Sequence, residues 1–226
     1  SMSGGAPTDP ERFDEEDLMS REAEYSRSGF SLQFMLDTRM SDANKYPLKL
    51  SDLIMMDVDS EVAPVKVSWA SGKDQRLPEL PNLGFDGDRY CAPLYVSPEH
   101  VPYTGSILTI DPSGRGIDET GYAVTKMLGG MIYIRRWGGL KGGYDKDALE
   151  TVAKIAKEEN VNLIHIEDNF GDGMYTQLFK PVLNRIYPCT VEEFKVHTQK
   201  ELRIINTLEP VMNQHRLVMD KSIVIQ

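Results

Sequence analysis

The second half of the chain shows short apolar runs of strand length that follow one another closely. The first three lie at residues 106–110, 121–127 and 131–137. Apolar and polar residues alternate within the second run, and Gly129-Gly130 provides a tight turn into the third. Both features are typical of strands joined as an antiparallel meander. We therefore predict three antiparallel strands in this part of the chain.

After this meander, helical and strand patterns alternate. Apolar residues recur at helical spacing in the segments 145–159, 175–186 and 198–212. Runs of strand character follow these segments at 161–166, 190–196 and 217–219. The order β-β-β-α-β-α-β-α-β predicts an α/β fold in which helices flank a mixed β-sheet. This order is the RNase H-like arrangement.

The first half is less regular. Residues 11–35 have a helical pattern, and the run 53–56 gives a weak indication of a strand. Between residues 60 and 105, one strand is plausible at 65–69, and frequent prolines argue against any long regular element. We predict that residues 1–60 are a disordered tail and linker. Residues 61–226 would then form the folded domain, with its core at 106–226 and an irregular region before it.

The acidity of the chain is concentrated in its first half. The net charge is −10, and residues 1–105 hold 19 acidic and 10 basic residues. Residues 106–226 hold 16 acidic and 15 basic residues, so this part is nearly neutral. A protein needs only a local basic surface to follow phosphates. The overall charge therefore does not exclude a nucleic-acid partner.

Composition indicates an intracellular protein without a membrane segment. The apolar runs are too short to span a bilayer, and the first residues lack the pattern of a signal peptide. The two cysteines do not form a metal-type pair, which fits a reduced compartment, although one disulfide stays open.

Two predicted strands end on carboxylates, Asp111 and Glu167. Strand ends of an α/β sheet can bring distant residues to one edge, where clustered carboxylates repel one another unless a cation lies between them. Oxygen ligands suit Mg²⁺ or Mn²⁺, and two such ions can cleave a phosphodiester. For either acid alone, a turn former or a helix N-cap is the simpler interpretation. The glycine-rich turn at 111–116 is no phosphate loop, because a strand follows it, and the sequence contains no Walker A motif.

Three motifs resemble the nuclease domain of the phage terminase large subunit, most closely the DNA maturase B type of short-tailed phages. They begin with Asp-Pro-Ser-Gly-Arg-Gly at 111, Ile-Glu-Asp-Asn-Phe-Gly at 166 and Lys-Glu-Leu-Arg-Ile-Ile at 200. Residues 30–50 also resemble the segment that joins the packaging ATPase of that family to its nuclease. The resemblance covers most of the chain from about residue 11, and it is looser at 60–105.

The resemblance implies a metal site and a function. Asp111 matches the first metal-binding acid and Glu167 the second, with Asp168 as an adjacent candidate. The third acid of the family lies in a His-Asp-Asp motif on a C-terminal helix; the sequence up to residue 226 lacks this motif, and Asp220 is a doubtful substitute. Whether the acid lies beyond residue 226 stays open, and so does an incomplete metal site in this chain. The implied activity is an endodeoxyribonuclease that uses two Mg²⁺ or Mn²⁺ ions to cut concatemeric double-stranded DNA during packaging.

The resemblance also implies partners. These are double-stranded DNA, an ATPase domain in the same parent chain, the small terminase subunit and the portal protein. The location would be the host cytoplasm, transiently at the procapsid.

Basic residues near the proposed site could contact DNA phosphates. Lys200 and Arg203 are three residues apart on one predicted helix and so share a face; Lys195 lies just upstream, and Arg115 lies in the first turn. For all four, a solvated surface is the alternative interpretation. His165 lies inside an apolar run, and we predict that it packs in the core.

Two rival functions stay open at this stage. The chain could be a DNA-gripping or docking module of the packaging motor, with catalysis latent or absent. It could also be another RNase H-like enzyme such as a resolvase or transposase, although residues 30–50 argue against this.

Overall fold

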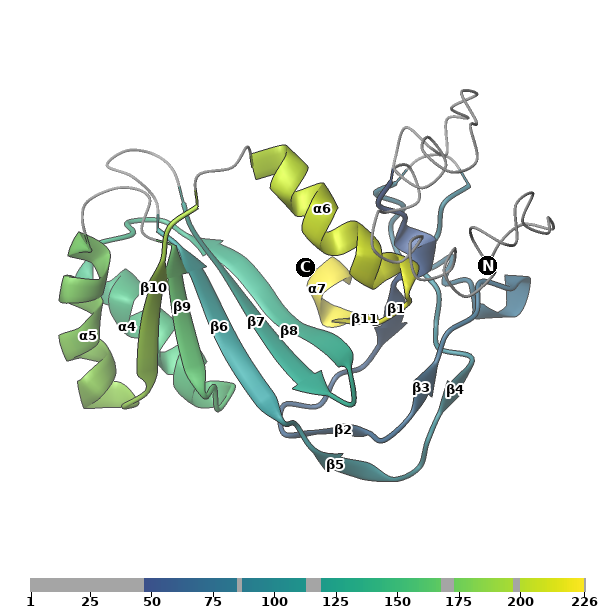
Figure 1. The fold of residues 1–226 in the computed structure, drawn as a ribbon, viewed down its shortest axis with the longest axis horizontal. Coiled ribbons are helices and arrows are strands. Elements are labelled where there is room, and N and C mark those ends of the chain that lie inside the picture. Colours follow the sequence, from purple (N-terminus) through teal and green to yellow (C-terminus); the bar gives the residue numbers. More distant parts are fainter. Residues whose placement is uncertain (1–46, 85–86, 113–118, 168–172, 197–199, 226) are drawn as a thin grey trace, which may run out of the picture.

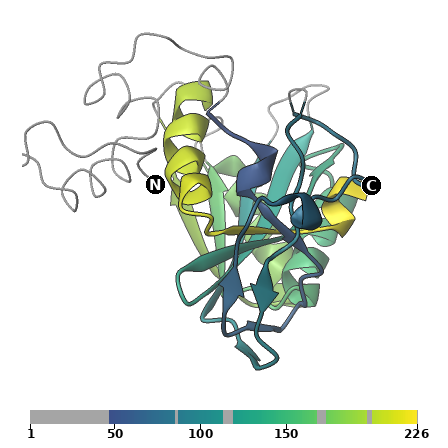
Figure 2. The ribbon, with the colours of Figure 1, turned by 90° about the vertical axis from the view of Figure 1, so that its right-hand side faces the viewer.

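The fold is described by a computed structural model that covers residues 47–84, 87–112, 119–167, 173–196 and 200–225. The predicted helix at 11–35 lies outside these residues. Figure 1 shows a twisted central sheet with helices on both of its faces, and Figure 2 shows the same layers from the side. None of the helices in the described ranges combines the length and apolarity needed to cross a membrane.

Seven strands form the central sheet in the order β1-β11-β8-β7-β6-β9-β10. The strands are β1 (Ile54–Met56), β6 (Gly105–Asp111), β7 (Thr120–Leu128), β8 (Met131–Leu140), β9 (Leu163–Glu167), β10 (Thr190–Phe194) and β11 (Leu217–Asp220). Strands β6, β7 and β8 form the predicted antiparallel meander. The remaining neighbours, β9 beside β6, β10 beside β9, β11 beside β8 and β1 beside β11, are parallel. The predicted mixed sheet is confirmed.

Helices alternate with strands as the sequence predicts. They are α4 (Lys146–Glu158), α5 (Met174–Ile186) and α6 (Lys200–Asn213), followed by a short α7 (Ser222–Ile225) that was not predicted. Helices α4 and α5 cover one face of the sheet, where Phe179 and Leu183 pack with Leu108, Ile110 and Ile164. All five of these side chains are fully buried. This core fixes strands β6 and β9 side by side.

Helix α6 covers the other face, but only near β8, β11 and β1. Its residue Met212 belongs to a second buried cluster with Leu53, Met55 and Met219. Strand β1 is thus part of the main sheet, although it lies before residue 61, where we placed the start of the domain. The weak indication of a strand at 53–56 is confirmed by β1.

The region before the meander contains only short elements in its described residues. Two small antiparallel pairs, β2 (Val62–Pro64) with β5 (His100–Pro102) and β3 (Val67–Ser68) with β4 (Tyr95–Val96), make up its strands. Short 3-10 turns η1 (Leu50–Asp52) and η2 (Lys73–Gln75) accompany them. The predicted strand at 65–69 is therefore shorter than expected, since only Val67 and Ser68 pair with β4.

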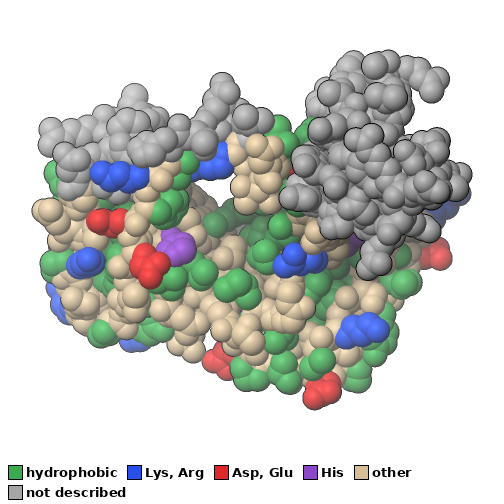
Figure 3. All heavy atoms as spheres, viewed as in Figure 1, with side chains coloured by type: hydrophobic (Ala, Val, Ile, Leu, Met, Phe, Trp, Pro, Cys, Tyr) green, Lys and Arg blue, Asp and Glu red, His purple; other side chains and the backbone are tan. Residues whose placement is uncertain are grey.

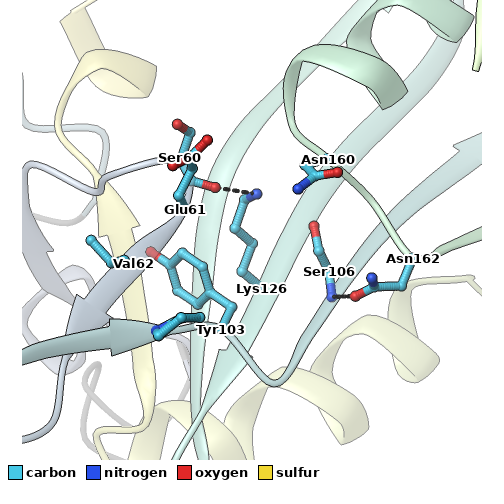
Figure 4. A pocket seen from close by; sticks show the side chains of 9 residues that line it. Ser60, Glu61, Val62, Tyr103, Ser106, Lys126, Asn160 and Asn162 are labelled. Carbon is cyan, nitrogen blue, oxygen red and sulfur yellow. Dashed lines mark hydrogen bonds between the residues drawn. The ribbon is translucent and has the colours of Figure 1, made fainter.

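A buried lysine connects this region to the sheet. The ammonium of Lys126, on β7, donates hydrogen bonds to the carbonyl oxygens of Ser60 at 2.7 Å and Glu159 at 2.5 Å. It lies beside a polar cavity of about 340 Å³ that Tyr103 and Asn162 also line (Figure 4). Burial lowers the pKa of Lys126, and the neighbouring Glu159 carboxylate opposes that shift. This contact joins the chain around residue 60 to the C-terminal end of α4.

Candidate active site at the carboxyl ends of strands β6 and β9

The two predicted metal-binding acids lie on neighbouring strands. Asp111 is the last residue of β6 and Glu167 is the last residue of β9. These strands are parallel, with Ile110 opposite Ile166, so the two acids occupy the next position of the same register. Because side chains alternate across a strand, both acids point away from the α4–α5 core, into which Ile110 and Ile166 are buried. The sheet thus places two carboxylates next to each other on one face.

An arginine from α6 reaches one of these acids. The guanidinium Nη2 of Arg203 lies 3.5 Å from Oε2 of Glu167, whose side chain is only 11% exposed. Helix α6 therefore places a positive charge next to Glu167, on the face of the sheet opposite to α4 and α5. The sequence grouped Arg203 with possible phosphate contacts, and the structure places it at the proposed site.

The sheet face around the acids is left open by the helices. One row across it runs through Trp137, Ala123, Thr109, His165 and Glu192, which are register partners on five neighbouring strands. Figure 3 shows this side of the molecule, hollowed between strands β9–β10 and helix α6. Among the described residues, helices α4 and α5 thus leave this face of the sheet uncovered.

The prediction that His165 packs in the core is wrong. Its side chain is 34% exposed, and its Nε2 lies 3.3 Å from Oε2 of Glu192. The reason is the strand period: Ile164 and Ile166 take the buried positions of β9, so His165 between them must face the open side. The apolar run in the sequence did not reveal this alternation, because a strand that is buried on both faces has a similar run of apolar residues.

The remaining predicted site residues separate into three groups. Lys195 is exposed directly after β10. Asp168, Arg115 and the side chain of Lys200 lie outside the described residues. Asp220 does not join the carboxylate pair, because strands β7 and β8 lie between β11 and β6.

Asp220 instead links β11 to β8, to the segment after β1 and to the start of α7. Its Oδ2 accepts hydrogen bonds from the backbone N–H of Val58 at 3.1 Å and from Arg135 at 3.2 Å. Its Oδ1 accepts from the backbone and hydroxyl of Ser222, at 2.8 and 2.6 Å. Both carboxylate oxygens are thus used for structure.

The donor set suits a hard divalent cation. Two adjacent carboxylates offer the oxygen ligands that Mg²⁺ and Mn²⁺ prefer, and a cation between them would relieve their mutual repulsion. Within the described ranges, no group of three or more His, Cys, Asp or Glu residues comes together at metal-binding distance. The described part of the site is therefore a carboxylate pair with an arginine beside it.

A shallow hollow lies beside Asp111. It has a volume of about 380 Å³, and its lining includes Thr109, Gly121, Ala123 and Trp137. Sequence reasoning did not assign Trp137 to the site, yet the residue is 43% exposed. Gly138 and Gly139 after it leave room for side chains of the same chain: a Cβ at Gly138 would lie 2.8 Å from the hydroxyl oxygen of Tyr122, and one at Gly139 would collide with the Glu119 side chain.

Comparisons with known proteins agree with this arrangement. Residues 110–217 match a family model described as "Terminase Bacteriophage T7, Ribonuclease H-like domain". The large terminase subunit of Enterobacteria phage T3 is 48% identical over 223 residues, which are 99% of this chain. The chain spans only 38% of the length of that relative.

Solved structures of terminases also align with the chain. The human cytomegalovirus terminase nuclease domain, in a Mn-soaked and inhibitor-bound form, aligns with 54% of this chain and 66% of its own, at 13% identity and a TM-score of 0.40. The large terminase of a thermophilic bacteriophage, in complex with ADP, aligns with 94% of this chain and 42% of its own, at 11% identity and a TM-score of 0.47.

The family match begins at Ile110, near the end of β6, and runs through β7, β8, β9 and β10 to the first residue of β11, so it includes both acids. Residues 110–217 of this chain therefore belong to the RNase H-like domain family of phage terminases.

Proposed function

We propose that this chain carries the metal-dependent endonuclease of a viral DNA-packaging terminase, an endodeoxyribonuclease that cuts concatemeric double-stranded DNA. The observation that carries the proposal is the pair Asp111 and Glu167, held side by side at the ends of parallel strands on the open face of the sheet. The family match of residues 110–217 supports it.

The two acids would hold the divalent ions, and we expect two ions with Asp168 as a further ligand. Bound ions of this kind supply an activated water and stabilise the charge on the leaving oxygen. The role of the protein is to fix the ligands before DNA arrives. Strands β6 and β9 do this because the buried side chains of Ile110 and Ile166 anchor the residues just before both acids.

Phosphate contacts would come from basic side chains around the acids. Arg203 lies at Glu167, and Lys195 is exposed at the end of the neighbouring strand. We include Lys200 and Arg115 in this set from their positions in the sequence. A guanidinium close to the carboxylate pair can contact a phosphate in two places at once, which a lysine cannot.

The wider setting follows from the terminase relatives. We propose an ATPase domain in the same parent chain, with the small terminase subunit and the portal protein as packaging partners. The location would be the host cytoplasm, with transient attachment to the procapsid. Nothing in this chain resembles a base-reading module, so we expect weak sequence preference.

Metal removal tests the proposal directly. Supercoiled plasmid is incubated with the purified chain in Mn²⁺, in Mg²⁺ and in EDTA, and nicked and linear products are measured on gels. We expect product with Mn²⁺ and none with EDTA, because the carboxylate pair cannot activate water without a cation. A chain that retains plasmid in a band-shift assay but yields no product with either metal would be a DNA-gripping module, and the proposal that residues 1–226 cut DNA by themselves would be wrong.

Replacement of Arg203 tests the phosphate contact. Arg203→Ala should weaken DNA binding similarly for all sequences and lower the slope of log Kd against log salt by about 1, because one phosphate contact is lost. Arg185→Ala is the control, since Arg185 pairs with Glu150 on the helix-covered side of the sheet. An unchanged salt slope in Arg203→Ala would assign Arg203 to Glu167 alone.

A further inference from the structure

We propose that Trp137 and the small residues beside it form a platform that contacts the sugar and base of the DNA nucleotide next to the scissile phosphate. The inference deepens the proposed nuclease function and rests on it. It concerns the hollow beside Asp111, whose lining includes Thr109, Gly121, Ala123, Trp137 and Gly138.

The sheet register fixes where the platform lies. Trp137, Ala123 and Thr109 are register partners on β8, β7 and β6, so they form one continuous row. Asp111 and Gly121 form the next row on the same face. Strands are about 4.8 Å apart, so two strands place the Trp137 backbone about 10 Å from that of β6. This separation is comparable to the size of one nucleotide.

The side chains give the hollow a low, largely apolar floor. Gly121 has no side chain, and Ala123 contributes only a methyl group, whereas Trp137 lines the hollow with a large indole. The main core lies on the other face of the sheet, and the Trp137 side chain stays 43% exposed. An indole left in solvent on an open face can bury its ring against the sugar and the base edge of a nucleotide, and this burial stabilises binding.

Neither backbone geometry nor close packing requires a glycine at position 121, beside Asp111. A Cβ atom built at Gly121 would meet its nearest neighbour, the Cβ of Asp111, at an ordinary 3.9 Å. The strand would therefore tolerate a side chain at this position. A larger residue at 121 should fold normally and fill the hollow, which gives a test that does not change Trp137.

The chain offers a direct optical reporter, since it contains only two tryptophans. Trp69 stacks on His215 with ring centroids 3.4 Å apart. In a Trp69→Phe background, fluorescence reports Trp137 alone. Titration with a short DNA duplex in Ca²⁺ should quench this emission saturably. If Trp69→Phe does not fold, the difference in quenching between the wild-type chain and Trp137→Ala gives the same information.

Binding measurements complete the test. Loss of the indole contact should raise the Kd for DNA by about 5-fold or more in Trp137→Ala, whereas Trp137→Phe should retain most of the affinity. Gly121→Val should weaken binding in the same direction. Tyr95→Ala is the matched control, because Tyr95 is similarly exposed, at 49%, but lies on strand β4 of a separate small sheet.

The outcomes separate this inference from the proposed function. Metal-dependent nicking with no quenching and an unchanged Kd in Trp137→Ala would overturn the platform and leave the nuclease standing. Quenching without nicking would overturn the nuclease, and with it the place of the platform beside a scissile phosphate. Quenching by neither duplex DNA nor a single-stranded oligonucleotide would overturn the inference.

Discussion

Asp111→Asn should lower Mn²⁺-dependent plasmid nicking by about 100-fold or more, because it removes one of the two charges that would hold the metal. Asparagine keeps the shape of the side chain but not its negative charge, so the loss would be chemical and not steric. The wild-type rate in Mn²⁺ is the reference, and product is followed over time on gels.

The same substitution should leave the fold intact. Asp111 ends its strand on the open face, and the core residues Leu108 and Ile110 of that strand are unchanged. We expect the free energy of unfolding to change by less than about 1 kcal/mol, as is usual for a residue outside the core. Asp147→Asn is the control, since Asp147 is exposed on α4 behind the sheet. Equal nicking by wild type and Asp111→Asn would remove Asp111 from the proposed metal site.

Lys126→Ala should destabilise the protein by about 3–5 kcal/mol, because it breaks a buried charge network. Lys126 is 1% exposed and lies 3.7 Å from Oε2 of Glu159, which is 4% exposed. The Nε of Arg135 lies 3.6 Å from the same oxygen, so the Glu159 carboxylate is balanced by two cations. Removal of the lysine leaves a buried carboxylate with one of them and two carbonyl oxygens without their donor.

A pair of variants separates charge from packing. Lys126→Met keeps most of the volume but still leaves Glu159 buried, so it should also destabilise the protein. Adding Glu159→Gln should recover part of that loss, since a buried pair replaced on both sides is often tolerated. Urea unfolding, followed by circular dichroism, measures the midpoints of the wild-type chain, Lys126→Met, Glu159→Gln and the double variant. Independent, additive effects of the two substitutions would show that Lys126 and Glu159 do not interact.

Local patterns in the sequence predicted the meander, the helices α4, α5 and α6, and the two strands that end on acids. This succeeded because each element has a period of its own: two residues in strands and 3.6 in helices. Since the order of elements limits the topology of a mixed sheet, the neighbouring positions of Asp111 and Glu167 could be predicted before any coordinates were considered. The three motifs then indicated the family.

What only the tertiary structure decided involves pairings between distant parts of the chain. Strand β1 is three residues long, so its own pattern is weak, and its place in the sheet depends on β11, more than 160 residues later. The open position of His165, the contact of Arg203 with Glu167 and the burial of Lys126 depend in the same way on which neighbour covers each face. The sequence by itself determined the elements and the acids at their ends. The packing of those elements decided what surrounds the acids, because burial and ion pairing are set by residues far apart in the chain.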